Sequence, residues 1–174
     1  MTQLSFGDLP VHDTLADARA HVNAERFKPA GVRCPCCDLF VKVYRRKLNS
    51  GIALGLLALW KLRNSGLPQT YHHVNAVART LERMGSRNQL AAAQIPLARF
   101  WGLVEEKHNV DTSKSQSGEW RLTAAGEIFV QGGGVISKYI MIFNNHVLST
   151  SDEKVFIQAC LGQHFNYQEL MERT

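Results

Sequence analysis

Residues 88–130 read NQLAAAQIPLARFWGLVEEKHNVDTSKSQSGEWRLTAAGEIFV, and this stretch decides the fold that the sequence predicts. Apolar residues recur at helical spacing from Ile95 to Trp101. Pro96 is tolerated only in a first turn, and Gly102 favours the left-handed conformation that ends a helix. Residues 103–107 and 119–122 then predict two strands joined by a polar loop. We therefore expect a short helix, a β-hairpin, and a further helix that begins after Thr123 as its N-cap.

This order of elements resembles the end of a winged helix-turn-helix domain, where a recognition helix is followed by a β-wing and a Leu-Thr-x-x-Gly helix start. The residues that carry the resemblance are Gly102, Leu103, Val104, Trp120, Leu122, Thr123, Gly126 and Phe129. With the helices upstream, the resemblance covers roughly residues 50–131 and implies an α+β fold. The chain is also similar to small phage or prophage proteins that place a Cys-Pro-x-Cys segment ahead of such a domain.

The sequence predicts three segments. Residues 1–49 form an N-terminal helix and a cysteine knuckle, residues 50–131 the winged helix domain, and residues 132–174 a C-terminal extension of a β-hairpin and a helix. The hairpin of residues 138–148 turns at Asn144-Asn145, since Asn accepts positive φ. Its aliphatic strands suggest either completion of the core or a contact with a partner, including a second copy in a homodimer.

Two helices are expected ahead of the quoted stretch. The first, Gly51 to Arg63 with Ser50 as its cap, has almost no polar face, which predicts a central and mostly buried helix. The second spans roughly His72 to Met84. A short helix or turn through Leu90 to Ala93 then precedes the recognition helix, which begins at Ile95.

Positive charge is concentrated in the middle of the chain. The net charge is +5, and residues 39–104 contain one acid, Glu82, against the basic residues Lys42, Arg45, Arg46, Lys47, Lys61, Arg63, Arg79, Arg83, Arg87 and Arg99. Such a segment favours binding to a polyanion, and the alternative is a solvated helical surface that uses arginine. We expect double-stranded DNA as the partner.

The side chains expected to contact DNA fall into three groups. The basic end of the predicted strand carries Arg45, Arg46 and Lys47, and the second helix and the turn after it carry Arg79, Arg83 and Arg87. The recognition helix and its wing contribute Gln94, Arg99 and Lys114. Gln can pair with adenine and Arg with guanine, or either can contact only phosphate. The recognition helix carries few such side chains, which argues against strong sequence-specific reading.

Cys34-Pro35-Cys36-Cys37 has the spacing at which a turn brings two thiolates to one zinc ion. Cys34 and Cys37 would be two of the ligands. Cys160 and His164, one helical turn apart, would complete a Cys₃His zinc site, with His72, His73 and His108 as competing ligands. The alternatives are reduced cytosolic thiols and a redox motif, although no buried strand precedes Cys34 as a redox motif requires.

Several functions are disfavoured by the sequence. There is no H-E-x-x-H pair, nucleophile elbow or phosphate-binding glycine fingerprint, so we do not expect an enzyme. Apolar runs are too short for a membrane span, and the N-terminus lacks signal-peptide character, which predicts a cytoplasmic protein. The favoured role is a transcriptional regulator, phage-encoded in origin. The alternative is an interaction module that binds a host protein complex such as a polymerase or a defence system.

Overall fold

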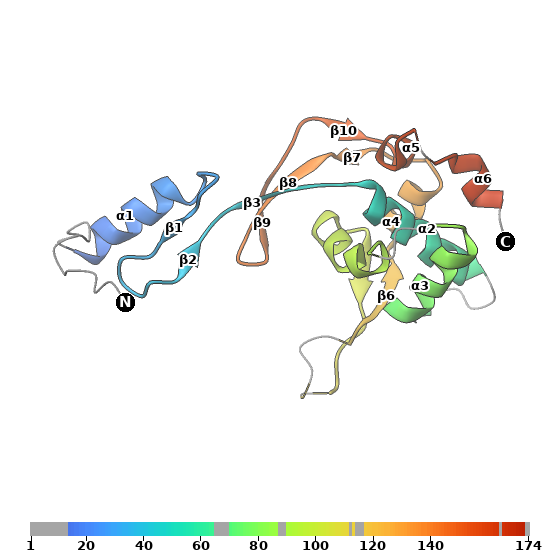
Figure 1. Ribbon diagram of the computed structural model, residues 1–174, viewed down its shortest axis with the longest axis horizontal. Helices are drawn as coiled ribbons and strands as arrows, with labels where there is room; N and C mark the ends of the chain where they lie inside the picture. Colours follow the sequence, from blue (N-terminus) through green and yellow to red (C-terminus); the bar gives the residue numbers. More distant parts are fainter. Residues whose placement is uncertain are drawn as a thin grey trace, which may run out of the picture. The chain divides into compact units, whose positions relative to one another are not determined.

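The computed structural model describes residues 14–64, 70–86, 90–111, 113, 117–163 and 165–172, and in them the protein is a mixed α+β structure (Figure 1). The described helices are α1 (Leu15–Glu25), α2 (Ser50–Asn64), α3 (Val74–Arg83), the 3₁₀ helix η1 (Ala92–Trp101), α4 (Ala124–Val130), α5 (Ile157–Leu161) and α6 (Tyr167–Glu172). The strands are β1 (Val32–Arg33), β2 (Phe40–Val41), β3 (Tyr44–Lys47), β4 (His72–His73), β5 (Val104–Glu106), β6 (Glu119–Leu122), β7 (Ile136–Ser137), β8 (Tyr139–Phe143), β9 (His146–Thr150) and β10 (Lys154–Val155). None of these helices is both long and apolar enough to cross a bilayer.

The chain divides into two compact units, which we call unit 1 (Met1–Arg46 and Met141–Ser149) and unit 2 (Lys47–Ile140 and Thr150–Thr174). The strands form four small sheets, with the orders β1-β2, β10-β7, β3-β8-β9 and β4-β6-β5. Asn144 and Asn145, between β8 and β9, have φ values of 47° and 60°. Two consecutive positive φ angles are those of a tight hairpin turn, which confirms the hairpin predicted there.

Helix α2 lies at the centre of unit 2, as the sequence predicts. Its side chains from Ile52 to Leu59 are buried, and α3, η1, α4, α5 and β6 all pack against it. A Cβ atom added at Gly55 would lie 2.8 Å from Cγ1 of Ile95, so this glycine allows η1 to approach closely. The predicted cap is wrong by one residue, because the Oδ1 atom of Asn49 accepts the Ile52 N–H at 3.0 Å and Ser50 is already helical.

Helix α3 begins two residues later than predicted. His72 and His73 form the short strand β4, in which His72 pairs with Trp120 of β6. The Nδ1 atom of His73 accepts the Asn75 N–H at 3.2 Å and so caps the helix. Pairing with a strand distant in sequence fixes the extended conformation of this dipeptide, and local periodicity does not record that pairing.

The predicted recognition helix differs from expectation. Instead of a turn through Ala93 and a helix from Ile95, a single 3₁₀ helix, η1, spans Ala92–Trp101. Pro96 lies inside it, and because proline has no N–H, the α-helical hydrogen bond at that position is absent. Gly102 ends the helix at φ 69°, as predicted.

The hairpin and the helix that follow it are confirmed. Strands β5 and β6 pair antiparallel with Val104 opposite Leu122. The Thr123 hydroxyl accepts the Gly126 N–H at 3.1 Å and donates to the Gly102 carbonyl at 2.6 Å. In Figure 1 the arrow of β6 points toward the helices of unit 2.

Replacing Gly126 with alanine is expected to destabilise unit 2. The added Cβ atom would lie 2.0 Å from the Leu103 carbonyl oxygen, which is backbone and cannot rotate away. We expect the free energy of unfolding to fall by about 1–3 kcal/mol in a urea titration, the usual cost of overpacking. Gly134→Ala is the control, since its nearest neighbour lies at an ordinary 3.5 Å. Equal stability of both variants would contradict the close approach.

Candidate nucleic-acid interface

Helix α3 presents two of the predicted DNA-binding side chains to solvent. Arg79 and Arg83 lie four residues apart and are both exposed, so they share one face of the helix. The guanidinium of Arg83 donates to the Thr80 hydroxyl at 3.0 Å, whereas Arg79 forms no ion pair with a described residue. Arg87, the third predicted arginine, lies outside the described residues.

Helix η1 offers less to a nucleic acid than the sequence suggests. The Oε1 atom of Gln94 is buried, and a Cβ atom added at Gly51 would lie 2.7 Å from it, so this side chain points toward α2. Gln94 as a whole is half-buried, and its contact with DNA stays a prediction. Arg99 is half-buried, with its guanidinium carbon 4.9 Å from the centroid of the Phe100 ring.

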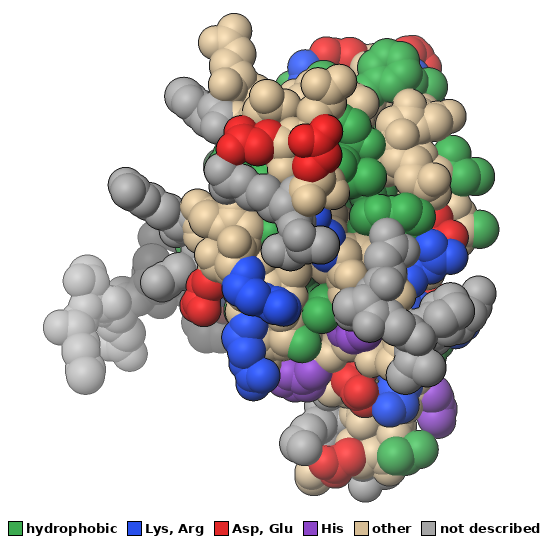
Figure 2. Space-filling view, turned by 90° about the vertical axis from the view of Figure 1, so that its right-hand side faces the viewer, with side chains coloured by type: hydrophobic (Ala, Val, Ile, Leu, Met, Phe, Trp, Pro, Cys, Tyr) green, Lys and Arg blue, Asp and Glu red, His purple; other side chains and the backbone are tan. Residues whose placement is uncertain are grey.

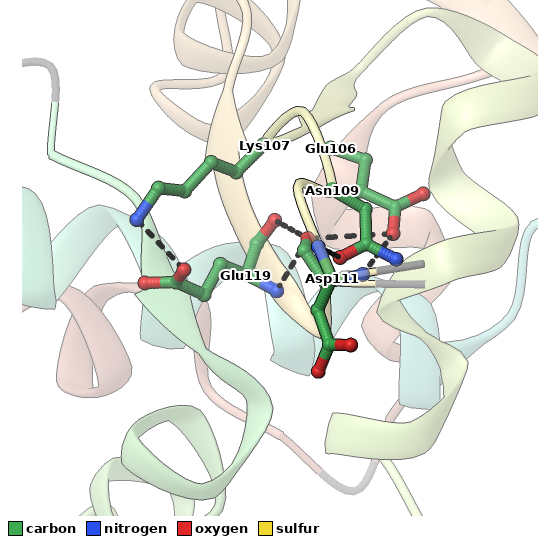
Figure 3. A network of polar contacts seen from close by, with 6 residues as sticks. Glu106, Lys107, Asn109, Asp111 and Glu119 are labelled. Atoms are coloured by element: carbon green, nitrogen blue, oxygen red, sulfur yellow. Dashed lines mark hydrogen bonds and ion pairs between the residues drawn. The ribbon is translucent and has the colours of Figure 1, made fainter. Parts of the chain in front are cut away.

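The base of the β5–β6 hairpin is held by a polar network, drawn in Figure 3. Lys107 Nζ lies 2.8 Å from a carboxylate oxygen of Glu119, and a carboxylate oxygen of Glu106 accepts the Ser117 N–H at 2.9 Å. Glu105, on the other face of β5, pairs with Arg121 of β6. All three glutamates are thus bound to donors within the hairpin, which lessens the repulsion they would exert on phosphate. Lys114 lies outside the described residues.

Two basic residues of the central segment are engaged within unit 2. Arg63 Nε lies 2.8 Å from Glu127 Oε1, with the geometry of an ion pair rather than a hydrogen bond. Lys61 Nζ donates to the Met171 carbonyl at 3.2 Å, and burial lowers its pKa. On the face drawn in Figure 2, Lys and Arg side chains stand in small groups among acidic and uncharged ones. The available positive charge is therefore smaller than the sequence count suggests.

The basic strand end is exposed as predicted. Arg45, Arg46 and Lys47 all lie on β3, every residue of which is exposed. The sequence interpretation missed Tyr44, whose ring centroid lies 5.2 Å from the Arg46 guanidinium carbon. The alternation of Lys42, Tyr44 and Arg46 is the signal that could have revealed it, since alternate residues of a strand share a face.

Cys34 and Cys37 lie in a tight turn of unit 1 between β1 and β2. The Cys34 N–H donates to the Leu39 carbonyl at 2.9 Å, and the Asp38 N–H donates to the Cys34 carbonyl at 2.8 Å. Asp38 has φ 57°, the conformation that closes the turn. Backbone hydrogen bonding from Cys36 and then Cys37 lowers the pKa of the Cys34 thiol. The turn therefore stabilises a thiolate.

The other two predicted zinc ligands are Cys160 and His164. Cys160 belongs to unit 2, where it is buried in α5, and this burial raises its pKa to about 11. His164 lies outside the described residues. Within the described ranges no three His, Cys, Asp or Glu side chains are grouped closely enough to hold a metal ion. A zinc site with Cys34 and Cys37 among its ligands therefore stays a prediction.

Comparison with known proteins finds no matching family model, no matching curated protein and no matching solved structure.

Protonation of His72 is expected to make the stability of unit 2 depend on pH. Burial lowers the pKa of His72 below its ordinary 6.5, and its Nε2 atom has no hydrogen-bond partner among the described residues. A proton therefore binds the unfolded chain more readily than the folded one, so the free energy of unfolding should fall as the pH is lowered through about 6.5. His72→Phe should weaken this dependence in urea titrations at several pH values, whereas His146→Gln, on exposed β9, should not. An unchanged pH dependence in His72→Phe would contradict the assignment.

Proposed function

We propose that unit 2 is a winged helix domain that binds double-stranded DNA, chiefly through phosphates. The observation that carries the proposal is the pair of exposed arginines on α3, Arg79 and Arg83, in a domain whose order of elements resembles that fold. In this order α2, β4, α3 and η1 precede a hairpin, and the strands pair as β4-β6-β5. A fold of this kind presents helices and a hairpin to the duplex.

Phosphate binding is favoured over the reading of base edges. Arg79 and Arg83 supply charge that the described residues do not neutralise with an ion pair, and charge of this kind displaces counterions from DNA. Base reading needs side chains that reach into a groove of the duplex. Because the side-chain oxygen of Gln94 is buried, η1 has few side chains of this kind. A role in transcriptional control would then depend on DNA shape or on a partner protein.

Replacing both arginines of α3 tests the proposal. In Arg79→Glu/Arg83→Glu, duplex affinity should fall at low salt. In the milder Arg79→Gln/Arg83→Gln, the slope of log affinity against log salt should become shallower by about 0.9 for each phosphate that the protein no longer neutralises. Fluorescence anisotropy with a labelled duplex at several salt concentrations measures both quantities.

A charge-matched control is available in unit 1. Arg19→Glu/Lys28→Glu makes the same change in net charge at exposed positions of α1 and the turn that follows it. This variant should keep most of the duplex affinity. If its affinity falls as far as that of the α3 variant, only net charge matters and the assignment to α3 is wrong.

A second function, the binding of a protein partner, is favoured by β9. All five residues of β9 are exposed, and it is the edge of the β3-β8-β9 sheet, where another strand could add. Val147 and Leu148 are the exposed apolar side chains of this strand. A biological activity that survives Arg79→Glu/Arg83→Glu but is abolished by Leu148→Lys would favour this function over DNA binding.

We also propose that Cys34 and Cys37 bind zinc. What supports it is the turn itself, which the Asp38 N–H closes on the Cys34 carbonyl and in which Asp38 adopts positive φ. Zinc would be held by two thiolates here, and it would add stability to a unit that buries few side chains. Cys160, which is buried in α5, and His164 are the predicted further ligands.

Metal analysis of single cysteine variants tests this second proposal. Cys34→Ser and Cys37→Ser should lose bound zinc and melt at a lower temperature, because each removes a thiolate ligand. The matched control is Cys36→Ser, an exposed residue of the same turn, which should keep the metal. Zinc content that is the same in all three variants would contradict the site, and a drop in zinc content in Cys160→Ser would restore Cys160 as a ligand.

A further inference from the structure

Residues 42–46 form an extended segment of unit 1 with two different faces, and residues 44–46 are exposed. Val43 is 5 % exposed, and its N–H donates to the Arg26 carbonyl at 2.8 Å, which fixes the segment against the end of α1. Since side chains alternate along an extended chain, Lys42, Tyr44 and Arg46 share the face opposite Val43. Tyr44 is 44 % exposed there, although tyrosine rings usually bury much of their surface.

The Tyr44 ring is flanked by cations on both sides in sequence. Lys42 Nζ lies 5.8 Å and the Arg46 guanidinium carbon 5.2 Å from the ring centroid. Lys42 also donates to the Pro29 carbonyl, which holds its charge in place. Neither cation forms an ion pair with a described acidic side chain. The row thus offers an aromatic ring close to two positive charges that no described acidic side chain pairs with.

Unit 1 repeats this combination of cation and ring at a second place. The Arg26 guanidinium carbon lies 5.2 Å from the ring centroid of Phe27 and 5.3 Å from that of Phe143, and Phe27 is 53 % exposed. The described acids of unit 1 do not neutralise these cations. Two of them, Glu25 and Asp38, pair instead with Lys28 and Arg33.

We propose that the Lys42–Tyr44–Arg46 row binds single-stranded nucleic acid. A base would stack on the Tyr44 ring or on the guanidinium plane of Arg46, and the two cations would hold the neighbouring phosphates. A duplex hides the faces of its bases and gives the ring nothing to stack on. An acidic peptide would pair with the cations and leave the ring unused. The proposal goes beyond duplex binding by unit 2 and does not depend on it.

Tyr44→Ala tests the stacking. With a labelled oligothymidine at low salt, its affinity should fall about 5- to 150-fold, the fold-change of 1–3 kcal/mol per stacked base. Tyr44→Phe keeps the ring and should bind like the unchanged protein. Arg46→Gln should lower the affinity and make the salt slope shallower by about 0.7, the value for one phosphate contact on a single strand.

Two controls separate this site from the rest of the molecule. Phe156→Ala removes another ring that is 53 % exposed, in unit 2, and should leave oligothymidine binding unchanged. Duplex binding by Tyr44→Ala should also be unchanged. The single-strand proposal can therefore fail while the assignment of duplex binding to α3 stands, and the assignment to α3 can fail while the single-strand proposal stands.

Three results would overturn the inference. They are the absence of oligothymidine binding at low salt, equal affinity of Tyr44→Ala and the unchanged protein, and equal decreases in affinity for oligothymidine and duplex in Tyr44→Ala. If polyglutamate at matched ionic strength binds as tightly as oligothymidine and is insensitive to Tyr44→Ala, the row is a surface for an acidic protein instead. Circular dichroism of each variant confirms that the fold is retained.

Discussion

The burial of α2 is the constraint on which unit 2 depends. Its apolar side chains from Ile52 to Leu59 are at most 1 % exposed, and each large one contributes roughly 1.5–3 kcal/mol relative to exposure. A helix that is apolar on every side needs cover on every side, which α3, η1, α4, α5 and β6 provide. Gly51 and Gly55 let η1 come near. The exposed face of α3 follows from this packing, because its other face is committed to α2.

The sequence predicts those features of the fold that depend on local chemistry. The helix before Arg63, the Asn144-Asn145 turn, the stop at Gly102 and the Thr123 cap were all predictable, because periodicity, positive φ and capping act within a few residues. The 3₁₀ form of η1 and the strand β4 were not. Both depend on packing or pairing with segments distant in sequence, and no local pattern records that.

The sequence predicts which residues the candidate site contains, but not which way each side chain points. Sequence spacing places Arg79 and Arg83 on one helical face, and they are exposed there. It cannot tell that Gln94 turns toward Gly51, nor that Arg63 has Glu127 as its partner, because both contacts join elements far apart in the chain. Counting basic residues therefore overstates the charge that a polyanion would meet. The same limit applies to Cys160, whose burial in α5 no cysteine spacing reveals.

Charge alone does not distinguish one nucleic acid from another, because every phosphate attracts every exposed arginine. The two units differ in what accompanies the charge. On α3, Arg79 and Arg83 stand on a helix without an aromatic ring in contact with either guanidinium among the described residues, which suits a phosphate backbone whose bases are paired. On the segment of Lys42 and Arg46, the Tyr44 ring lies close to both cations, which suits a strand whose bases are free to stack. A chain with both surfaces would bind a duplex and an unpaired strand through different interactions. Salt would weaken the binding of both nucleic acids, whereas removal of the Tyr44 ring would weaken only the binding of the unpaired strand.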